Sequence, residues 1–136
     1  MFTEPLAYQI YFGIIAPRTS YAVLPVNGES LGIYVVVEVV DGRFTDRHFP
    51  GNGDGNLYKE AWPARTDDEY FRSALETNEE TATNDGFIAF ATDMLATSDA
   101  ELPQTLAQYM DLGRLLDYMA VNYAIANWDG ITTDAE

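Results

Sequence analysis

The dipeptide Asn27-Gly28 constrains the fold most tightly, because it stands between two runs of residues that favour β-strands. Asn-Gly is preferred in two-residue hairpin turns, where both central residues need a positive φ angle. The second run, Leu31 to Val40, is nearly all apolar, which predicts a strand buried on both faces. Pro25 has no amide hydrogen to donate, so its strand should have an edge or a bulge there. The sequence therefore predicts an antiparallel hairpin.

Helical patterns surround this hairpin. Thr3 is expected to cap a first helix that ends near Gly13, and residues 42–66 are expected to form loop and short turns. From residue 67 the apolar spacing becomes helical and predicts helices over 67–77, over 84–98, from Pro103, and over 111–126, the last capped by Asp111. Two apolar stripes are expected to form core: Phe87, Phe90, Ala91, Met94 and Leu95, and Leu112, Leu115, Leu116, Met119, Tyr123 and Ala126.

These elements predict one α+β domain over residues 1–136. Its parts would be a helix plus a hairpin over 1–41, a loop over 42–66, and a helical segment over 67–136 that ends in a loop of the catalytic type.

The charge balance excludes several classes of partner. The chain has 22 acidic and 7 basic residues and a net charge of −15, which opposes binding to nucleic acid and to anionic membranes. Eleven acids between residues 66 and 111 are interpreted as a solvated face. No apolar run approaches about 18 residues, and the first residues include Glu4 and no basic leader, so we expect a soluble chain without a signal peptide or membrane insertion. The compartment stays undetermined.

Several polar residues are candidates for a site. Glu38 lies in an apolar strand, so it needs a partner or a task if it is buried, unless it reaches water at the strand end. Lys59 is the only lysine and suits either a phosphate contact or an ordinary exposed position. His48, the only histidine, is interpreted as a partly buried ring. There are no cysteines, which excludes disulfides and thiolate metal sites.

The loop around Gly55 resembles part of a calcium loop. Asn52 and Asp54 would occupy two ligand positions of an EF-hand, but Pro50 and Ala61 stand at the two end positions that need acidic ligands. Because Asn, Gly and Asp are also ordinary turn residues, a turn is the alternative.

Asp129 follows an apolar helix and precedes Gly130 near the end of the chain. An aspartate delivered to a loop in this way can orient a hydroxyl group for phosphoryl transfer. The same residues also form an ordinary helix terminator. The local pattern leaves both interpretations open.

Several short blocks carry more information together than each does alone. In chain order they are Val26-Asn27-Gly28-Glu29 with Gly32-Ile33-Tyr34 and Glu38, then Asn56-Leu57-Tyr58-Lys59, then residues 74–79 (ALETNE), and finally Asn127 with Asp129. In this order they resemble the CotH family of atypical protein kinases, the spore coat protein H type, over roughly Ala7 to Ile131.

The resemblance implies a protein-kinase-like fold that binds ATP with Mg²⁺ and phosphorylates serines of a protein substrate. The hairpin would belong to the small lobe, and the strand ending near Glu38 would lead to the lobe connection beside the adenine. Residues 67–126 would be helices of the large lobe. Asp129 matches the catalytic-loop aspartate, and Glu38 and Lys59 are assigned to the cofactor side.

The chain also departs from the family pattern. The family's Arg-Gly-Asn-Ser-type phosphate-holding stretch and its Trp-Asp-x-Asp metal motif have no counterpart here, so no metal ligands are assigned. With a net charge of −15, we expect a partial kinase domain that alone binds ATP poorly and transfers no phosphate. The alternatives are a non-catalytic coat or interaction scaffold and an acidic calcium-binding module. Apolar surface left exposed is expected to promote self-association.

Overall fold

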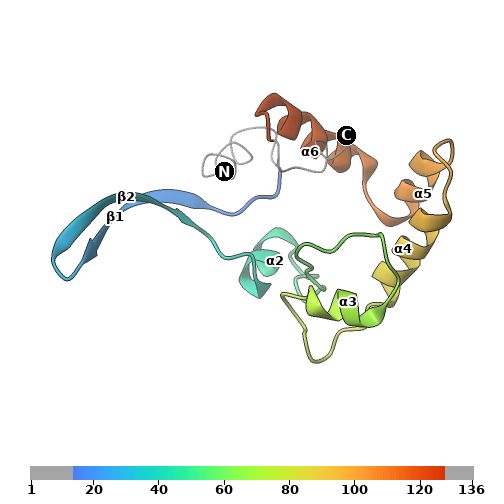
Figure 1. Ribbon diagram of the computed structural model, residues 1–136, viewed down its shortest axis with the longest axis horizontal. Coiled ribbons are helices and arrows are strands. Elements are labelled where there is room, and N and C mark those ends of the chain that lie inside the picture. Colours follow the sequence, from blue (N-terminus) through green and yellow to red (C-terminus); the bar gives the residue numbers. More distant parts are fainter. Residues whose placement is uncertain (1–13, 128–136) are drawn as a thin grey trace. The chain divides into compact units, whose positions relative to one another are not determined.

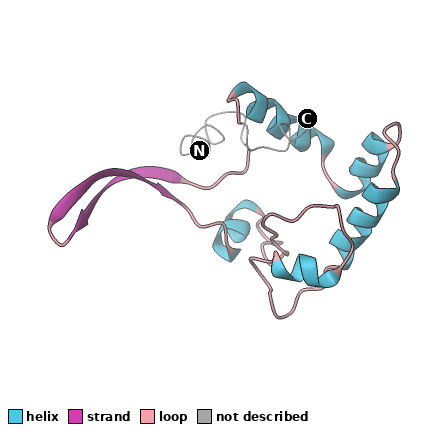
Figure 2. Cartoon of the chain, in the orientation of Figure 1, coloured by secondary structure: helices cyan, strands magenta, loops and turns pink. Residues whose placement is uncertain are grey.

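The computed structural model describes residues 14–127 (Figure 1). The chain falls into two compact units. One unit contains the chain up to Val39 and from Gly113 onward, and the other spans Val40–Leu112. The helix predicted between Thr3 and Gly13, and the loop with Asp129, lie outside the described residues. The described part contains a two-stranded antiparallel sheet and five helices, so the predicted α+β class is confirmed (Figure 2).

The predicted hairpin is present in the first unit. Strand β1 spans Thr19–Val26 and strand β2 spans Glu29–Val37. Asn27 and Gly28 form the turn with φ angles of 51° and 87°. Two successive positive φ angles define the mirror-image turn that matches the right-handed twist of the strands. The Asn-Gly signal therefore identified the turn correctly.

The register of the hairpin changes near Pro25, as the sequence predicted. Val23 pairs with Ile33 whereas Pro25 pairs with Ser30, so β2 holds one residue more than β1 between these pairs. Gly32 lies in this stretch with a φ angle of 101°, a conformation that costs a glycine little. The bulge thus places its extra residue on the strand opposite the proline.

The prediction that the second strand is buried on both faces is wrong. Ile33 is 74 % exposed, and most of β2 is exposed along its length. The sheet has two strands, and no further strand joins it among residues 14–127. An apolar run shows that a strand can be buried, but burial needs a second layer that a sequence pattern does not identify.

Helix α6, Leu112–Ala124, supplies the small core of the same unit. Its Val121 is 2 % exposed and packs with Ala16, joined by the partly buried Ile14, Tyr118 and Ile125. The expected core stripe of this helix is wrong at three positions, because Leu116, Tyr123 and Ala126 are exposed. The inward face is instead the neighbouring one, which Tyr118, Val121, Asn122 and Ile125 share at helical spacing.

Four helices form the second unit: α2 Gly42–His48, α3 Asp68–Ser73, α4 Asp85–Ala96 and α5 Leu102–Tyr109. Helix α2 corrects the expectation of loop over residues 42–66. Asp41 caps it by accepting the amide hydrogens of Arg43 and Phe44, and Phe44 is buried. The Arg43 guanidinium beside Asp41 lowers the pKa of that carboxyl group. Asp-Gly also begins many turns, so the local sequence does not distinguish a turn from a helix here. The burial of Phe44 favours the helix.

Aromatic rings line the interior of the second unit. The ring centroids of Phe71 and Phe87 are 4.4 Å apart, and those of Phe90 and Tyr109 are 5.1 Å apart. Phe71 is fully buried. The expected core stripe of α4 is confirmed in part: Ala91 is buried, Phe87, Phe90 and Met94 are half-buried, and Leu95 is 60 % exposed. All eleven acids between residues 66 and 111 are exposed, as the solvated-face interpretation predicted.

Candidate functional site

The Asn56–Lys59 block pairs with the block around residues 74–76 in the second unit. The amide of Lys59 donates to the carbonyl of Ala74 at 2.8 Å, and the amide of Glu76 donates to the carbonyl of Leu57 at 2.9 Å. These bonds flank an isolated antiparallel bridge. Two of the blocks that carry the family resemblance therefore lie side by side.

A chain of hydrogen bonds anchors this pair of segments to two helices. The Tyr58 hydroxyl donates to Asn84 Oδ1 at 2.9 Å, and Asn84 Nδ2 donates to Asp68 Oδ1 at 2.7 Å. Asp68 is the first residue of α3, and Asn84 directly precedes α4. Asn84 is only 1 % exposed, so its amide has to find its partners within the protein. These residues therefore fix how the block meets the helices.

Two further asparagines close the loop on itself. Asn56 Nδ2 donates to the carbonyl of Thr83 at 2.9 Å and to the Tyr58 hydroxyl at 3.1 Å. Asn78 Nδ2 donates to Asn56 Oδ1 at 3.1 Å and to the carbonyl of Asp54 at 2.7 Å. Most polar side chains of the Asn56–Lys59 block thus make hydrogen bonds within the fold.

Asp68 carries the negative charge of the hydrogen-bond network around Asn84. The hydrogen bond from Asn84 lowers the pKa of the Asp68 carboxyl group, and Arg72, 3.3 Å from its Oδ2, adds to the same effect. Arg72 and Asp68 are one helical turn apart, a spacing that favours such pairs.

Lys59 differs from its neighbours in the block. Leu57 and Tyr58 are half-buried, whereas Lys59 is exposed. Its amide takes part in the pairing described above, which leaves the ammonium group at the surface. A phosphate contact by Lys59 stays a prediction.

Glu38 lies directly after β2, and it is paired. Its Oε2 accepts the amide hydrogen of Arg18 at 2.9 Å, and its Oε1 accepts from Arg18 Nη2 at 2.8 Å. The Glu38 side chain is 14 % exposed and that of Arg18 is 73 % exposed. The sequence left a buried, partnered carboxylate and a hydrated one as alternatives, and the structure shows the partnered one. Glu38 belongs to the first unit and Lys59 to the second.

Asp129 lies outside the described residues, so its catalytic role stays a prediction. The residues that lead to it are anchored to α6. Asn127 Nδ2 donates to Asn122 Oδ1 at 2.6 Å, and the amide of Asn127 donates to the carbonyl of Asn122 at 2.9 Å. Asn122 is fully buried. Asn127, one of the matched residues, therefore fixes the exit of the chain from the helix.

The loop of the calcium hypothesis packs against α2. Gly53 is buried, and its carbonyl accepts a hydrogen bond from the Thr45 hydroxyl at 2.7 Å. Asn52 and Asp54 on either side are exposed. Within residues 14–127, no group of three or more acidic or histidine side chains could hold a metal ion. His48 is half-buried beside the Phe44 ring, with centroids 4.6 Å apart, which confirms the interpretation of its ring.

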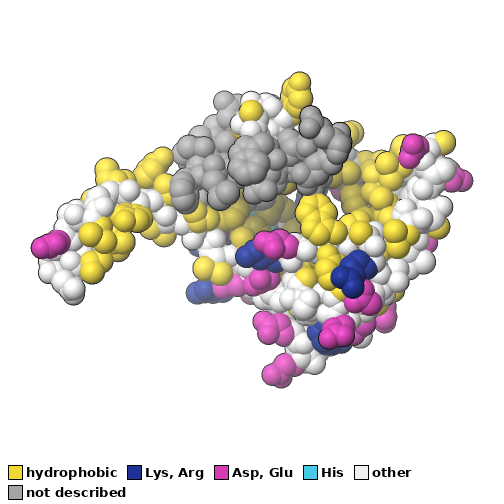
Figure 3. Space-filling model, viewed as in Figure 1, with side chains coloured by type: hydrophobic (Ala, Val, Ile, Leu, Met, Phe, Trp, Pro, Cys, Tyr) yellow, Lys and Arg dark blue, Asp and Glu magenta, His cyan; other side chains and the backbone are white. Residues whose placement is uncertain are grey.

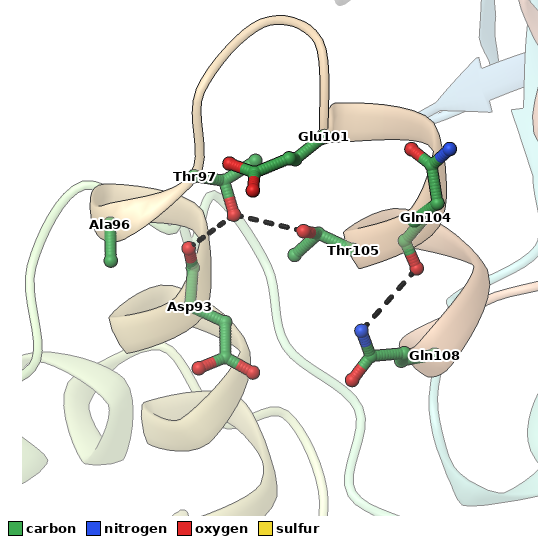
Figure 4. Close-up of a pocket in the computed structure, with 7 residues that line it drawn as sticks. All are labelled: Asp93, Ala96, Thr97, Glu101, Gln104, Thr105 and Gln108. Atoms are coloured by element: carbon green, nitrogen blue, oxygen red, sulfur yellow. Dashed lines mark hydrogen bonds between the residues drawn. The ribbon is translucent and has the colours of Figure 1, made fainter.

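An open, polar pocket of about 400 Å³ lies between α4 and α5 (Figure 4). Its lining is Asp93, Ala96, Thr97, Glu101, Gln104, Thr105 and Gln108.

The acids of this pocket are already bonded. Asp93 accepts from the Tyr109 hydroxyl and Glu101 accepts from the Ser98 hydroxyl, which raises the pKa of Tyr109 and lowers that of Glu101. The Thr97 hydroxyl lies 2.9 Å from that of Thr105. These hydrogen bonds connect α4 to α5 and occupy polar atoms of the pocket lining.

The comparisons with known proteins agree with the ordered blocks. A family model described as CotH kinase protein matches residues 1–135. The chain belongs to this kinase family, as the sequence predicted. No curated protein matches it, and no solved structure does. Within residues 14–127, none of the helices is both long and apolar enough to cross a membrane.

Sequence reasoning missed the residues that build the network. Asn84 was assigned only to a helix start, and Asp68 only to a predicted helix and its solvated face. The signal that could have suggested more is the occurrence of Asn56 and Asn78 inside two matched blocks, since an asparagine amide offers both hydrogen-bond donors and an acceptor. Which partners they find depends on contacts between segments about 20 residues apart, such as Asn56 with Asn78.

Proposed function

We propose that this chain serves in ATP-dependent protein phosphorylation of the CotH kinase type, and that residues 1–136 alone bind ATP poorly and transfer no phosphate. The acceptor would be a serine hydroxyl of a protein. The observation that carries this proposal is the family match over residues 1–135, essentially the whole chain. A kinase-like arrangement, with the hairpin in the small lobe and the later helices in the large lobe, is part of the proposal.

Three residues, Asp129, Lys59 and Glu38, have roles in the proposed reaction. Asp129 orients the serine hydroxyl and accepts its proton. The Asn122–Asn127 anchor supports this role, because it fixes the chain two residues before Asp129. Lys59 offers a point charge to the phosphates from its exposed position, and Glu38 directly follows the strand that leads toward the nucleotide.

The proposed reaction uses ATP together with Mg²⁺. When bound, Mg²⁺ neutralises charge on the phosphates of ATP. Residues 14–127 contain no cluster of acidic or histidine side chains that fits a metal ion, so we derive no step through it.

The test is transfer of labelled phosphate from Mg²⁺-ATP to casein, measured for the full-length gene product and for residues 1–136 alone. We expect the Asp129→Asn variant to lose transfer by about 100-fold or more, as removal of a proton acceptor does. The matched control is Asp99→Asn, which changes an exposed acid in the α4–α5 loop and should transfer phosphate normally.

Two results would contradict the proposal. Unchanged transfer by Asp129→Asn would remove the role of that residue. Absence of transfer by the full-length gene product, together with a melting temperature that Mg²⁺-ATP does not change, would favour a non-catalytic scaffold.

A further inference from the structure

The hairpin has one face that is almost wholly apolar. Residues directly opposite each other in an antiparallel pair lie on the same face. Thr19 pairs with Val37, Tyr21 with Val35, and Val23 with Ile33. We call the face that these six residues share the Tyr21 face. The opposite face includes Ser20, Ala22, Tyr34 and Val36.

The Tyr21 face is exposed. Tyr21 is 65 %, Val23 60 %, Ile33 74 % and Val37 40 % exposed. Hydrophobic side chains run along the hairpin in the space-filling view (Figure 3). Contiguous apolar surface of this kind marks interaction sites in soluble proteins.

The charge of the hairpin favours a second copy of the chain as the occupant. Glu29 is the only charged residue between 19 and 37, although the whole chain has a net charge of −15. Two copies that met elsewhere would repel each other, whereas this surface is nearly neutral. An antiparallel arrangement across a twofold axis would also place the two Glu29 carboxylates at opposite ends of the contact. A strongly charged partner would gain no attraction here.

The available area fits a weak dimer. Four exposed apolar side chains and the half-buried Val35, at roughly 100 Å² each on average, give on the order of 500 Å² per copy, so two copies would bury about 1,000 Å² in total. This is the lower end of the range for specific interfaces. The contact is therefore expected to have a dissociation constant in the micromolar range.

We infer that two copies of this chain pack through their Tyr21 faces, antiparallel across a twofold axis. The contact is independent of phosphoryl transfer, since it uses neither Asp129 nor Lys59.

The test is the mass of the 136-residue chain in solution, measured by light scattering and sedimentation from about 1 to about 200 µM. We expect the mass to rise from that of one chain to twice that value and to stop there. The double variant Tyr21→Thr with Ile33→Thr should weaken the dimer by about tenfold or more. Threonine keeps a high strand preference, so the hairpin is expected to persist.

The matched control is Tyr34→Thr with Val36→Thr, which makes the same type of change on the opposite face, where both residues are also exposed. Its dimer should be as strong as that of the unaltered chain. Equal weakening by both double variants would overturn the assignment to one face.

Two other outcomes would overturn the inference itself. One is a chain that stays monomeric at the highest concentration. If the Tyr21/Ile33 change then lowers its melting temperature and the Tyr34/Val36 change does not, the Tyr21 face is covered within the chain. The other is binding of the monomer to phosphatidylcholine vesicles that the same change abolishes, because lipid would then be the occupant.

Discussion

The Tyr58 hydroxyl donates a hydrogen bond to the buried side-chain oxygen of Asn84, 2.9 Å away, and so joins a loop to the start of a helix 26 residues later in the chain. Asn84 in turn donates to Asp68 at the start of α3. The Asn-Leu-Tyr-Lys block is thereby divided by role. Tyr58 and Asn56 hold the loop in place, and Lys59 is presented to solvent.

Replacing Asn84 with alanine should lower the free energy of unfolding by about 1–3 kcal/mol, because the half-buried Tyr58 hydroxyl loses its acceptor, Asp68 loses a donor, and the buried Asn84 side chain leaves a gap. Urea titration monitored by circular dichroism measures the change. The control is Asn52→Ala, an exposed asparagine, which should change stability by less than about 0.5 kcal/mol. Equal losses in the two variants would show that the network contributes nothing.

Asp68 should make stability depend on pH in the acid range. Its pKa is lowered in the folded protein from an ordinary value of 3.8, chiefly by Asn84. A lowered folded pKa means that the stabilisation is fully present above pH 3.8 and is lost as the pH falls toward the folded pKa. We expect the Asp68→Asn variant to melt below the unaltered chain at pH 6, with the gap closing below pH 3.8. A gap that stays constant with pH would contradict this.

Gly53 should tolerate no side chain. A Cβ atom at this position would lie 2.5 Å from the Cα atom of Asp46 in α2, and backbone cannot move aside cheaply. Gly53→Ala is therefore expected to cost about 1–3 kcal/mol or more of stability. At Gly55 the nearest atom to a Cβ is 3.7 Å away, an ordinary contact, so Gly55→Ala is the matched control with a small effect. Thermal unfolding of both variants tests the comparison.

The Arg18–Glu38 pair should contribute more through its backbone bond than through its ion pair. Arg18 is 73 % exposed, so the charge attraction is worth less than about 1 kcal/mol. Glu38→Gln keeps a side-chain oxygen for the Arg18 amide, whereas Glu38→Ala removes it. The alanine variant is thus expected to lose about 1 kcal/mol more than the glutamine variant. The stabilities of the two variants, measured with and without added salt, separate the contribution of the backbone hydrogen bond from that of the ion pair. A larger loss of stability in Glu38→Gln than in Glu38→Ala would contradict the prediction.

Lys59→Ala should leave stability unchanged, because the side chain is exposed. Under the proposed function the same change should weaken nucleotide binding by about tenfold, since one charge-assisted contact with phosphate is lost. A fluorescent ATP analogue measures the affinity. Lys59→Arg keeps the charge and serves as the control, with a smaller loss expected. Equal affinity in the alanine variant and the unaltered chain would exclude Lys59 from the nucleotide site.

Local features were predictable from the sequence because neighbouring residues determine them. The turn at Asn27-Gly28 needs two positive φ angles, and these residues supply them at low cost. The bulge near Pro25 follows from a missing amide hydrogen. Helix α2 was missed because its stability depends on distant contacts. Thr45, for example, bonds to the carbonyl of Gly53.

The sequence by itself determined the α+β class, the hairpin and its turn, the acidic solvated surface and membership of the CotH kinase family. Only the tertiary structure decided that β2 is exposed, that α6 turns Val121 rather than Leu116 inward, and that Glu38 is paired with Arg18. Periodicity shows which residues share a face, but burial depends on what packs against that face. The polar network around Asn84 depends likewise on residues brought together by folding, since hydrogen bonds form between neighbours in space.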